Sequence, residues 1–297
     1  MTSIVIPAHN EGRVIGRLLD ALLADTTATG PDIVVVCNGC TDDTARVAGE
    51  RGDRVRVVEV PTPSKHHALR VGDEHARGFP RLYVDADVVV GAADVRALVG
   101  ALDRSPELLA VAPGRDIPLA GCAWPVRAYY RVWQRLPAVR EGLFGRGVIA
   151  VTEPGHARIA ALPPLMADDL AASLAFGPGE RRVVEKARVV VRPPRTWSDL
   201  IRRRVRAATS SAEYERYRAA RGAETPEPEP GPGPEQTERT ARTGTADLRA
   251  LLRARPALLP GVVVFVVAAL AARRGSRKAI RNQDFSTWLR DESSRQG

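Results

Sequence analysis

This 297-residue sequence is poor in cysteine and in aromatic residues. Its three cysteines, Cys37, Cys40 and Cys122, are too few and odd in number for a disulfide framework, and they fit a reducing compartment. Aromatic residues make up only 5% of the chain, so a core must be built mainly from Val, Leu, Ala and Ile. Because 44% of the residues are apolar and 27% are charged, one or two ordinary globular domains are still expected.

The N-terminal segment lacks the features of a secretory signal, and the turn that follows it lacks glycine. No basic stretch precedes Ser3–Pro7 and the apolar run is short, so we expect a strand there and a cytoplasmic protein. The next turn reads Pro7-Ala8-His9-Asn10-Glu11. A nucleotidyltransferase with a related sheet needs a glycine-rich loop over the triphosphate, so the sequence disfavours that class.

Strand and helix signals alternate through the first half of the chain. Short apolar runs predict strands at 3–6, 32–37, 55–60 and 82–84, and helical spacing predicts helices at 11–23, 43–51 and 66–76. Asn10 is expected to cap the first of these helices. This order predicts an α/β fold with a mainly parallel sheet flanked by helices. Farther on we expect helices at 165–175 and 197–217, with strand structure at 183–191.

Composition changes after residue 220. Residues 221–245 are rich in Pro, Glu, Gly and Thr, which predicts a disordered linker between a folded domain at 1–220 and a helical tail at 246–297. From Asp247 to Gly297 the tail has ten Lys and Arg against four Asp and Glu, and it contains 17 uncharged residues from Pro256 to Ala272. An apolar, basic tail favours lipid over nucleic acid as its partner.

The uncharged run is at the lower limit for a membrane span. A span would also carry the basic tail across the bilayer, against the positive-inside tendency. We therefore expect the tail to contact the inner face of the cell membrane peripherally. A spanning helix and a helix packed on the folded domain remain alternatives.

Two acidic residues follow the expected strand Leu82-Tyr83-Val84. Asp85 and Asp87 are one residue apart, and their carboxylates repel unless a cation or a solvated turn relieves them. Hard divalent ions such as Mg²⁺ or Mn²⁺ suit such oxygen ligands. By itself the pair is compatible with either a metal site or a solvated turn.

Several segments together resemble, in order, the motifs of family 2 glycosyltransferases of the GT-A fold. They are Ile4–Glu11, Val34–Thr44, Lys65–Gly72, Tyr83–Asp87, Met166–Leu170 and a divergent stretch at 194–207. The resemblance covers about residues 2–210. It implies a GT-A catalytic domain, a divalent metal ion and inversion at the anomeric carbon. It also implies transfer of a hexosyl group from a nucleotide-diphosphate sugar to a hydroxyl of a polysaccharide, lipid-linked or metabolite acceptor.

The same resemblance implies a role for eight residues. Ala8 and Glu11 would lie at the nucleotide, Asn38 at its base, Lys65 near the base or phosphates, Asp85 at the ribose or a metal-bound water, Asp87 on the metal, and Asp169, with Asp168 beside it, as the catalytic base. The stretch at 194–207 does not contain the Gln-x-x-Arg-Trp motif that accompanies processive polymerases, so formation of a single glycosidic bond is expected.

Other functions remain open at this stage. Cys37 and Cys40 form a C-x-x-C between an expected strand and helix, the context of a thiol-disulfide redox site. A catalytically inactive, membrane-associated binding protein of the same fold is a second alternative. Aromatic residues gather between Trp124 and Trp133, where they suit either stacking on a sugar or lipid, or a protein core.

Overall fold

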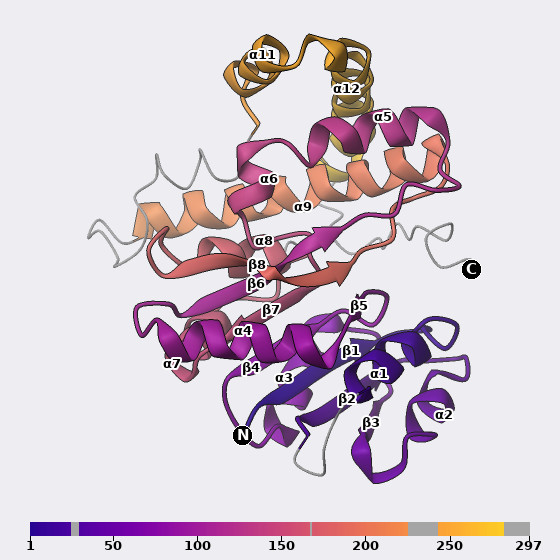
Figure 1. Cartoon of the computed structure of the whole chain (residues 1–297), viewed down its shortest axis with the longest axis vertical. Coiled ribbons are helices and arrows are strands. Elements are labelled where there is room, and N and C mark those ends of the chain that lie inside the picture. The colour runs from indigo at the N-terminus through magenta and orange to yellow at the C-terminus, as the bar shows by residue number, and fades with distance from the viewer. Residues whose placement is uncertain (25–29, 167, 225–242, 282–297) are drawn as a thin grey trace. The chain divides into compact units, whose positions relative to one another are not determined.

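The computed structural model describes residues 1–24, 30–166, 168–224 and 243–281. Contacts divide the chain into two units, each built from three separate segments (Figure 1). Unit 1 consists of Met1–Ile117, Gly145–Pro163 and Phe176–Arg192. Unit 2 consists of Pro118–Phe144, Pro164–Ala175 and Pro193–Gly297.

Unit 1 contains an eight-stranded sheet in the order β3-β2-β1-β4-β7-β6-β8-β5. The strands are β1 (Ser3–Ala8), β2 (Asp32–Asn38), β3 (Arg56–Val60), β4 (Arg81–Val84), β5 (Val89–Val90), β6 (Ala110–Asp116), β7 (Val148–Val151) and β8 (Arg181–Val190). The four neighbours β3, β2, β1 and β4 are parallel, as predicted. Beyond them the sheet is mixed, because β7 runs antiparallel to β4 and β6, and β5 runs antiparallel to β8.

The helices of unit 1 cover both faces of this sheet. They are α1 (Ile15–Leu23), α2 (Thr44–Gly49), α3 (Lys65–His75), α4 (Ala92–Arg104) and α7 (Glu153–Ala160), with a 3-10 turn at Gly52–Arg54. Side chains alternate between faces along a strand. Ile4 and Ile6 of β1 therefore join the core under α1 and α4, whereas Val34 and Val36 of β2 pack with Ala68 of α3.

The predicted strands and helices of the first half are present, with shifted ends. All residues of β1 and β2 are buried, which is why these strands show unbroken apolar runs. The first helix begins at Ile15, four residues later than predicted, with Val14 as its N-cap residue. Asn10 is therefore not the cap of this helix, and the prediction was wrong on that point.

Unit 2 is helical in its described residues. Its helices are α5 (Trp124–Trp133), α6 (Pro137–Glu141), α8 (Asp168–Leu174), α9 (Trp197–Glu224), α11 (Thr245–Ala254) and α12 (Leu259–Arg281), with a 3-10 turn at Pro256–Leu258. Helix α12 packs on α5 and α9 (Figure 1). The predicted linker at 221–245 overlaps the end of α9 and the start of α11, and its central part, 225–242, lies outside the described residues.

The aromatic residues of α5 form part of the core of unit 2. The ring of Tyr129 stacks on Phe265 of α12 with the centroids 5.1 Å apart, and Tyr130 meets Tyr129 edge to face at 5.3 Å. Both tyrosines are buried. Of the two functions open to this cluster, the structure favours core packing for Tyr129 and Tyr130, whereas Trp124 is 63% exposed.

Candidate functional site

Three neighbouring parallel strands end at one edge of the sheet in unit 1. Strand β1 ends at Ala8, β2 ends at Asn38, and β4 ends at Val84, directly before Asp85. Because β1 pairs with both β2 and β4, these ends are adjacent. In open α/β sheets, ligands bind outside the carboxyl ends of the strands, so this edge is the candidate donor site.

Hydrogen bonds join the turns that follow β1 and β2. The side-chain amide of Asn38 donates to the backbone carbonyl oxygen of Ala8 over 2.8 Å, and the Cys40 thiol donates to the same oxygen over 3.4 Å. Nδ1 of His9 donates to the carbonyl oxygen of Asn38 over 2.5 Å. A direct hydrogen bond therefore joins Ala8 and Asn38, two of the predicted nucleotide-binding residues. Sequence reasoning had assigned nothing to His9.

Asn10 and Glu11 extend this connection. Asn10 has a φ of 53°, and its Oδ1 accepts a hydrogen bond from the backbone N–H of Thr41 over 2.7 Å. The backbone N–H of Glu11 donates to Thr44 Oγ1 over 2.8 Å, and Glu11 itself is buried. The side chain of Asn10 is thus hydrogen-bonded to the turn that follows β2, which explains why it does not cap α1.

Lys65 and Asp85 form an ion pair at the same edge. Lys65 is the first residue of α3, and Ser64 caps this helix by accepting a hydrogen bond from the N–H of His67. Lys65 Nζ lies 2.8 Å from Asp85 Oδ1, and the side chains are 28% and 38% exposed. Both groups are therefore accessible to a ligand, and the lysine ammonium has three N–H donors, enough for Asp85 and a phosphate oxygen together.

A glycine sets how closely α3 approaches the sheet. Gly72 of α3 faces β1, and a Cβ atom at this position would lie 2.3 Å from Val5 Cγ1. Any larger residue would force helix and strand apart. The glycine in the lysine-containing motif thus places α3, and with it Lys65, against the sheet.

A segment that the sequence analysis did not identify holds Asp85 from its other side. The backbone N–H of Asp85 donates to the carbonyl oxygen of Gly147 over 2.8 Å. Gly147 has a φ of 65°, and a Cβ there would lie 2.5 Å from Val88 Cγ1 and 3.2 Å from Asp85 Oδ2. The neighbouring Arg146 is buried, and burial lowers the pKa of its guanidinium to about 10. A Gly-Arg-Gly sequence directly before an apolar strand was the available signal.

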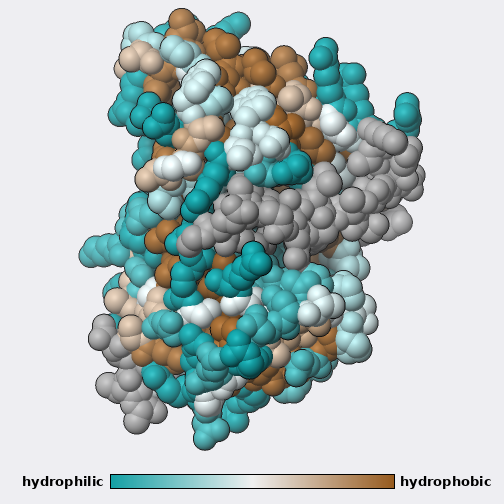
Figure 2. Space-filling view, turned by 90° about the vertical axis from the view of Figure 1, so that its right-hand side faces the viewer, coloured by the Kyte–Doolittle hydropathy of each residue, from teal (hydrophilic) through white to brown (hydrophobic). Residues whose placement is uncertain are grey.

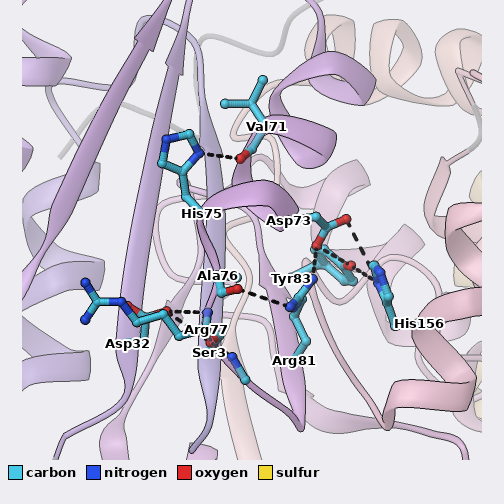
Figure 3. A network of polar contacts seen from close by, with 11 residues as sticks. Ser3, Asp32, Val71, Asp73, His75, Ala76, Arg77, Arg81, Tyr83 and His156 are labelled. Carbon is cyan, nitrogen blue, oxygen red and sulfur yellow. Dashed lines mark hydrogen bonds and ion pairs between the residues drawn. The ribbon is translucent and has the colours of Figure 1, made fainter.

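A second polar cluster ties the far end of α3 to β4 (Figure 3). The hydroxyl of Tyr83 donates to Asp73 Oδ1 over 2.8 Å, and Arg81 contacts the same carboxylate oxygen at 2.9 Å. Nδ1 of His156, from α7, lies 2.7 Å from the Tyr83 hydroxyl. Helix α3 is therefore attached to β4 at both ends, through Lys65 and through Asp73.

The acidic pair fits a divalent cation that is shared with substrate phosphates. Asp85 and Asp87 are both half-buried. Among the described residues, no three His, Cys, Asp or Glu side chains are grouped so that they could hold a metal ion. Mg²⁺ is commonly held by one or two carboxylates together with phosphate oxygens, so the two aspartates suffice as the protein's share of the ligands. The roles of Asp85 and Asp87 as metal ligands stay predictions.

The predicted base residues lie in unit 2. Asp168 and Asp169 are the first two residues of α8; Asp168 is half-buried and Asp169 is exposed. The remaining predicted residues, Ala8, Glu11, Asn38, Lys65, Asp85 and Asp87, all belong to unit 1. The base role of Asp168 and Asp169 stays a prediction.

The cysteine pair is poorly suited to redox chemistry. Cys37 is buried at the end of β2, and burial raises the pKa of its thiol to about 12, with the neighbouring Cys40 contributing. The thiolate is the reactive form, so a redox cysteine needs a lowered pKa rather than a raised one. The geometry instead gives Cys40 a structural role, because its thiol bonds the carbonyl oxygen of Ala8.

The sequence is similar to a family of known proteins and to several of their relatives. Residues 3–152 match the model of glycosyl transferase family 2. An uncharacterized glycosyltransferase of Mycobacterium bovis is 37% identical over 123 residues, 41% of this chain and 52% of that protein. A 4,4'-diaponeurosporenoate glycosyltransferase of Staphylococcus aureus is 39% identical over 90 residues, 29% of this chain and 24% of that protein. The chain spans about half the length, or less, of these curated relatives.

A solved structure extends the similarity in fold to most of the chain. A mannosyltransferase from Pyrobaculum calidifontis, in complex with GDP-mannose and Mn²⁺, has a TM-score of 0.64, with 19% sequence identity. The alignment covers 93% of this chain and 86% of that one. The predicted GT-A type of α/β fold is therefore confirmed.

Proposed function

Since this chain belongs to glycosyl transferase family 2, we propose that it transfers a hexosyl group from a nucleotide-diphosphate donor to an acceptor hydroxyl with inversion. The observation that carries the proposal is the Lys65–Asp85 ion pair beside the joined turns of Ala8 and Asn38. These groups place an ammonium, a carboxylate and a side-chain amide at the strand ends. The GDP-mannose and Mn²⁺ bound to the Pyrobaculum enzyme support the same chemistry.

Each residue has a defined task in this proposal. Ala8, Glu11 and Asn38 bind the nucleoside, and Lys65 binds a phosphate oxygen. Asp87, with Asp85 beside it, would hold Mg²⁺ or Mn²⁺, which would neutralise the charge that grows on the departing diphosphate. The ion pair of Lys65 and Asp85 keeps one positive and one negative side chain in place before the donor arrives.

The bond changes balance in a single displacement. The acceptor oxygen forms a bond to the anomeric carbon from the side opposite the leaving group, while the bond between that carbon and the phosphate oxygen breaks. The electron pair leaves with the nucleoside diphosphate. The proton of the acceptor hydroxyl passes to the carboxylate of Asp169, for which Asp168 is the alternative.

Three variants test this proposal. Asp87→Ala should abolish both transfer and the metal-dependent part of donor binding, whereas Asp103→Ala, on an exposed part of α4, should change neither. Asp169→Asn should bind donor normally but lose transfer. Donor binding is measured by thermal shift with UDP, GDP and dTDP sugars, with and without Mn²⁺. Full metal-dependent binding in Asp87→Ala would remove Asp87 from the site.

A further inference from the structure

Helix α12 has one packed face and one uncovered apolar face. Its packed face includes Val262, Phe265, Ala268, Ala272 and Ser276, all buried. The uncovered face consists of Leu259, Val263, Val266, Val267 and Leu270, which are between 39% and 56% exposed. This spacing places the five side chains in one stripe along the helix. A contiguous exposed stripe of large aliphatic residues marks an interaction surface.

The preceding helix is also largely uncovered. None of the ten residues of α11 is buried, and its leucines, Leu248, Leu251 and Leu252, recur at helical spacing. A helix of this length is marginally stable in water unless an apolar face is packed. These leucines are half-buried, so part of their surface, like the stripe on α12, remains available to a partner.

The positive charge of residues 245–281 favours an anionic partner for these helices. Residues 245–281 contain eight Arg and Lys but only one acid, Asp247. Arg249, Arg253, Arg273, Arg274 and Arg277 are exposed. Figure 2 shows apolar and hydrophilic side chains next to one another in the region of α11 and α12. Aliphatic residues bordered by arginines match the interface between acyl chains and anionic headgroups.

Length and composition alone leave a membrane span open, because Pro256–Arg277 has a mean hydropathy of 2.0 over its most apolar window. The packing of α12 argues against one. Gly261 lies against Ala128 of α5, and Gly275 lies against Val205 of α9. A crossing helix would carry exposed arginines of α5, such as Arg127, into hydrocarbon, or would have to leave its neighbours.

We propose that unit 2 docks on an anionic lipid leaflet through α11 and the stripe of α12, with α12 lying along the surface rather than crossing it. On the cytoplasmic side this would place the protein where a lipid-linked acceptor hydroxyl is presented. The docking does not depend on the proposed transfer reaction, since it uses none of the donor-site residues. Its test therefore needs neither donor nor acceptor.

The first experiment is co-sedimentation of the full chain with vesicles. Binding is expected to vesicles of phosphatidylcholine containing phosphatidylglycerol, and much less to phosphatidylcholine alone. The double variant Val263→Ser/Val267→Ser should weaken binding by at least about tenfold, because it removes two aliphatic side chains from the stripe. Asp87→Ala should bind vesicles as the parent does, so loss of transfer and loss of docking are distinguishable.

The arginines provide a matched comparison. The triple variant Arg273→Gln/Arg274→Gln/Arg277→Gln should weaken binding to the anionic vesicles, and raised salt should reduce the difference from the parent. Arg46→Gln/Arg54→Gln/Arg104→Gln removes the same charge from exposed positions in unit 1 and should bind normally. An equal loss of vesicle binding in the two triple variants would mean that only the net charge of the protein matters, which would overturn the proposed surface.

Two further results would contradict the proposal. In membranes from expressing cells, a surface-docked protein is released by alkaline carbonate, so retention would show that α12 spans the bilayer. In analytical ultracentrifugation without lipid, the parent should be monomeric. A dimer that Val263→Ser/Val267→Ser dissociates, together with no vesicle binding, would instead assign the stripe to a second copy of this chain.

Discussion

Lys65 and Asp85 meet across the boundary between a helix start and a strand end, with 2.8 Å between Nζ and Oδ1. The lysine is fixed by the Ser64 cap of α3, and the aspartate by the hydrogen bond of its backbone N–H to Gly147. The pair therefore joins two elements that are separately anchored. The ammonium group of Lys65 is thus held at the candidate site without being buried, since both side chains remain partly exposed.

Lys65→Ala should weaken donor use. The variant loses a charged donor to the phosphate and leaves the Asp85 carboxylate beside the incoming diphosphate, where the two negative groups repel. Hydrogen bonds to charged groups contribute about 1.5–3 kcal/mol, so kcat/KM for the donor should fall by roughly 10–150-fold. Steady-state kinetics and calorimetric titration with donor measure the change.

Two substitutions complete this comparison. Lys65→Arg keeps the charge and should retain more activity than Lys65→Ala. Lys186→Ala, on an exposed part of β8, removes the same charge and should leave kcat/KM unchanged. If Lys65→Ala used donor as well as the parent, Lys65 would hold Asp85 only as a structural pair.

Replacing tyrosine by phenylalanine should have different effects on stability at Tyr83 and at Tyr129. The hydroxyl of Tyr83 bonds Asp73 and contacts His156, so Tyr83→Phe should lower the free energy of unfolding by about 1–2 kcal/mol. The buried hydroxyl of Tyr129 has no hydrogen-bond partner among the described residues. Tyr129→Phe should therefore be neutral or stabilising.

Urea unfolding of both variants checks this pair. Asp73→Asn should destabilise more than Tyr83→Phe, because Asp73 also pairs with Arg81. Equal stability of the parent and Tyr83→Phe would show that the cluster at the far end of α3 contributes little. A large loss in Tyr129→Phe would reveal a partner for that hydroxyl.

The first half of the fold was predictable because its signals are local. Strands β1 and β2 are buried on both faces, so they appear in the sequence as unbroken aliphatic runs, and α1 shows its leucines at helical spacing. The actual role of Asn10 was not predictable, and the cap predicted there is absent. Its side chain bonds Thr41, and that contact arises only after β1 and β2 pair.

The mixed half of the sheet could not be predicted from local signals, because it forms through pairing of strands that are distant in the sequence. Strand β7 has four residues and β5 has two, and both run antiparallel to neighbours that are distant in sequence. At the candidate site, Asp85 and Lys65 could be identified from their motifs, but the support from Gly147 could not, because it lies 62 residues beyond Asp85 and acts through its backbone.

Stability should depend on pH through His156. Burial lowers the pKa of this imidazole, an effect that the charge of Asp73 opposes. The folded protein therefore binds the proton less tightly than the unfolded chain, whose histidine has a pKa of about 6.5. As pH falls through that value the unfolded chain takes up more protons, so the free energy of unfolding decreases until the folded-state pKa is passed.

Urea midpoints of the parent and His156→Gln at pH values on both sides of about 6.5 isolate this effect. The variant should lose less stability on acidification than the parent, although it is less stable at neutral pH because it loses the contact with Tyr83. Carboxylates titrate in both proteins, so only the difference between the two curves reports on His156. Parallel curves would mean that His156 titrates alike in the folded and unfolded chains.

Cys37 should be inert toward alkylation in the folded protein. Burial raises the pKa of its thiol to about 12, so very little of it is ionised near pH 8, and the side chain is inaccessible as well. Iodoacetamide followed by peptide mass analysis should leave Cys37 unmodified until denaturant is added. Cys37→Ala should retain most of its transferase rate, because its neighbour Asn38 still donates to Ala8 through the side-chain amide. Rapid labelling of Cys37 in the native protein, with loss of transfer in Cys37→Ala, would mean that the thiol takes part in chemistry at the end of β2.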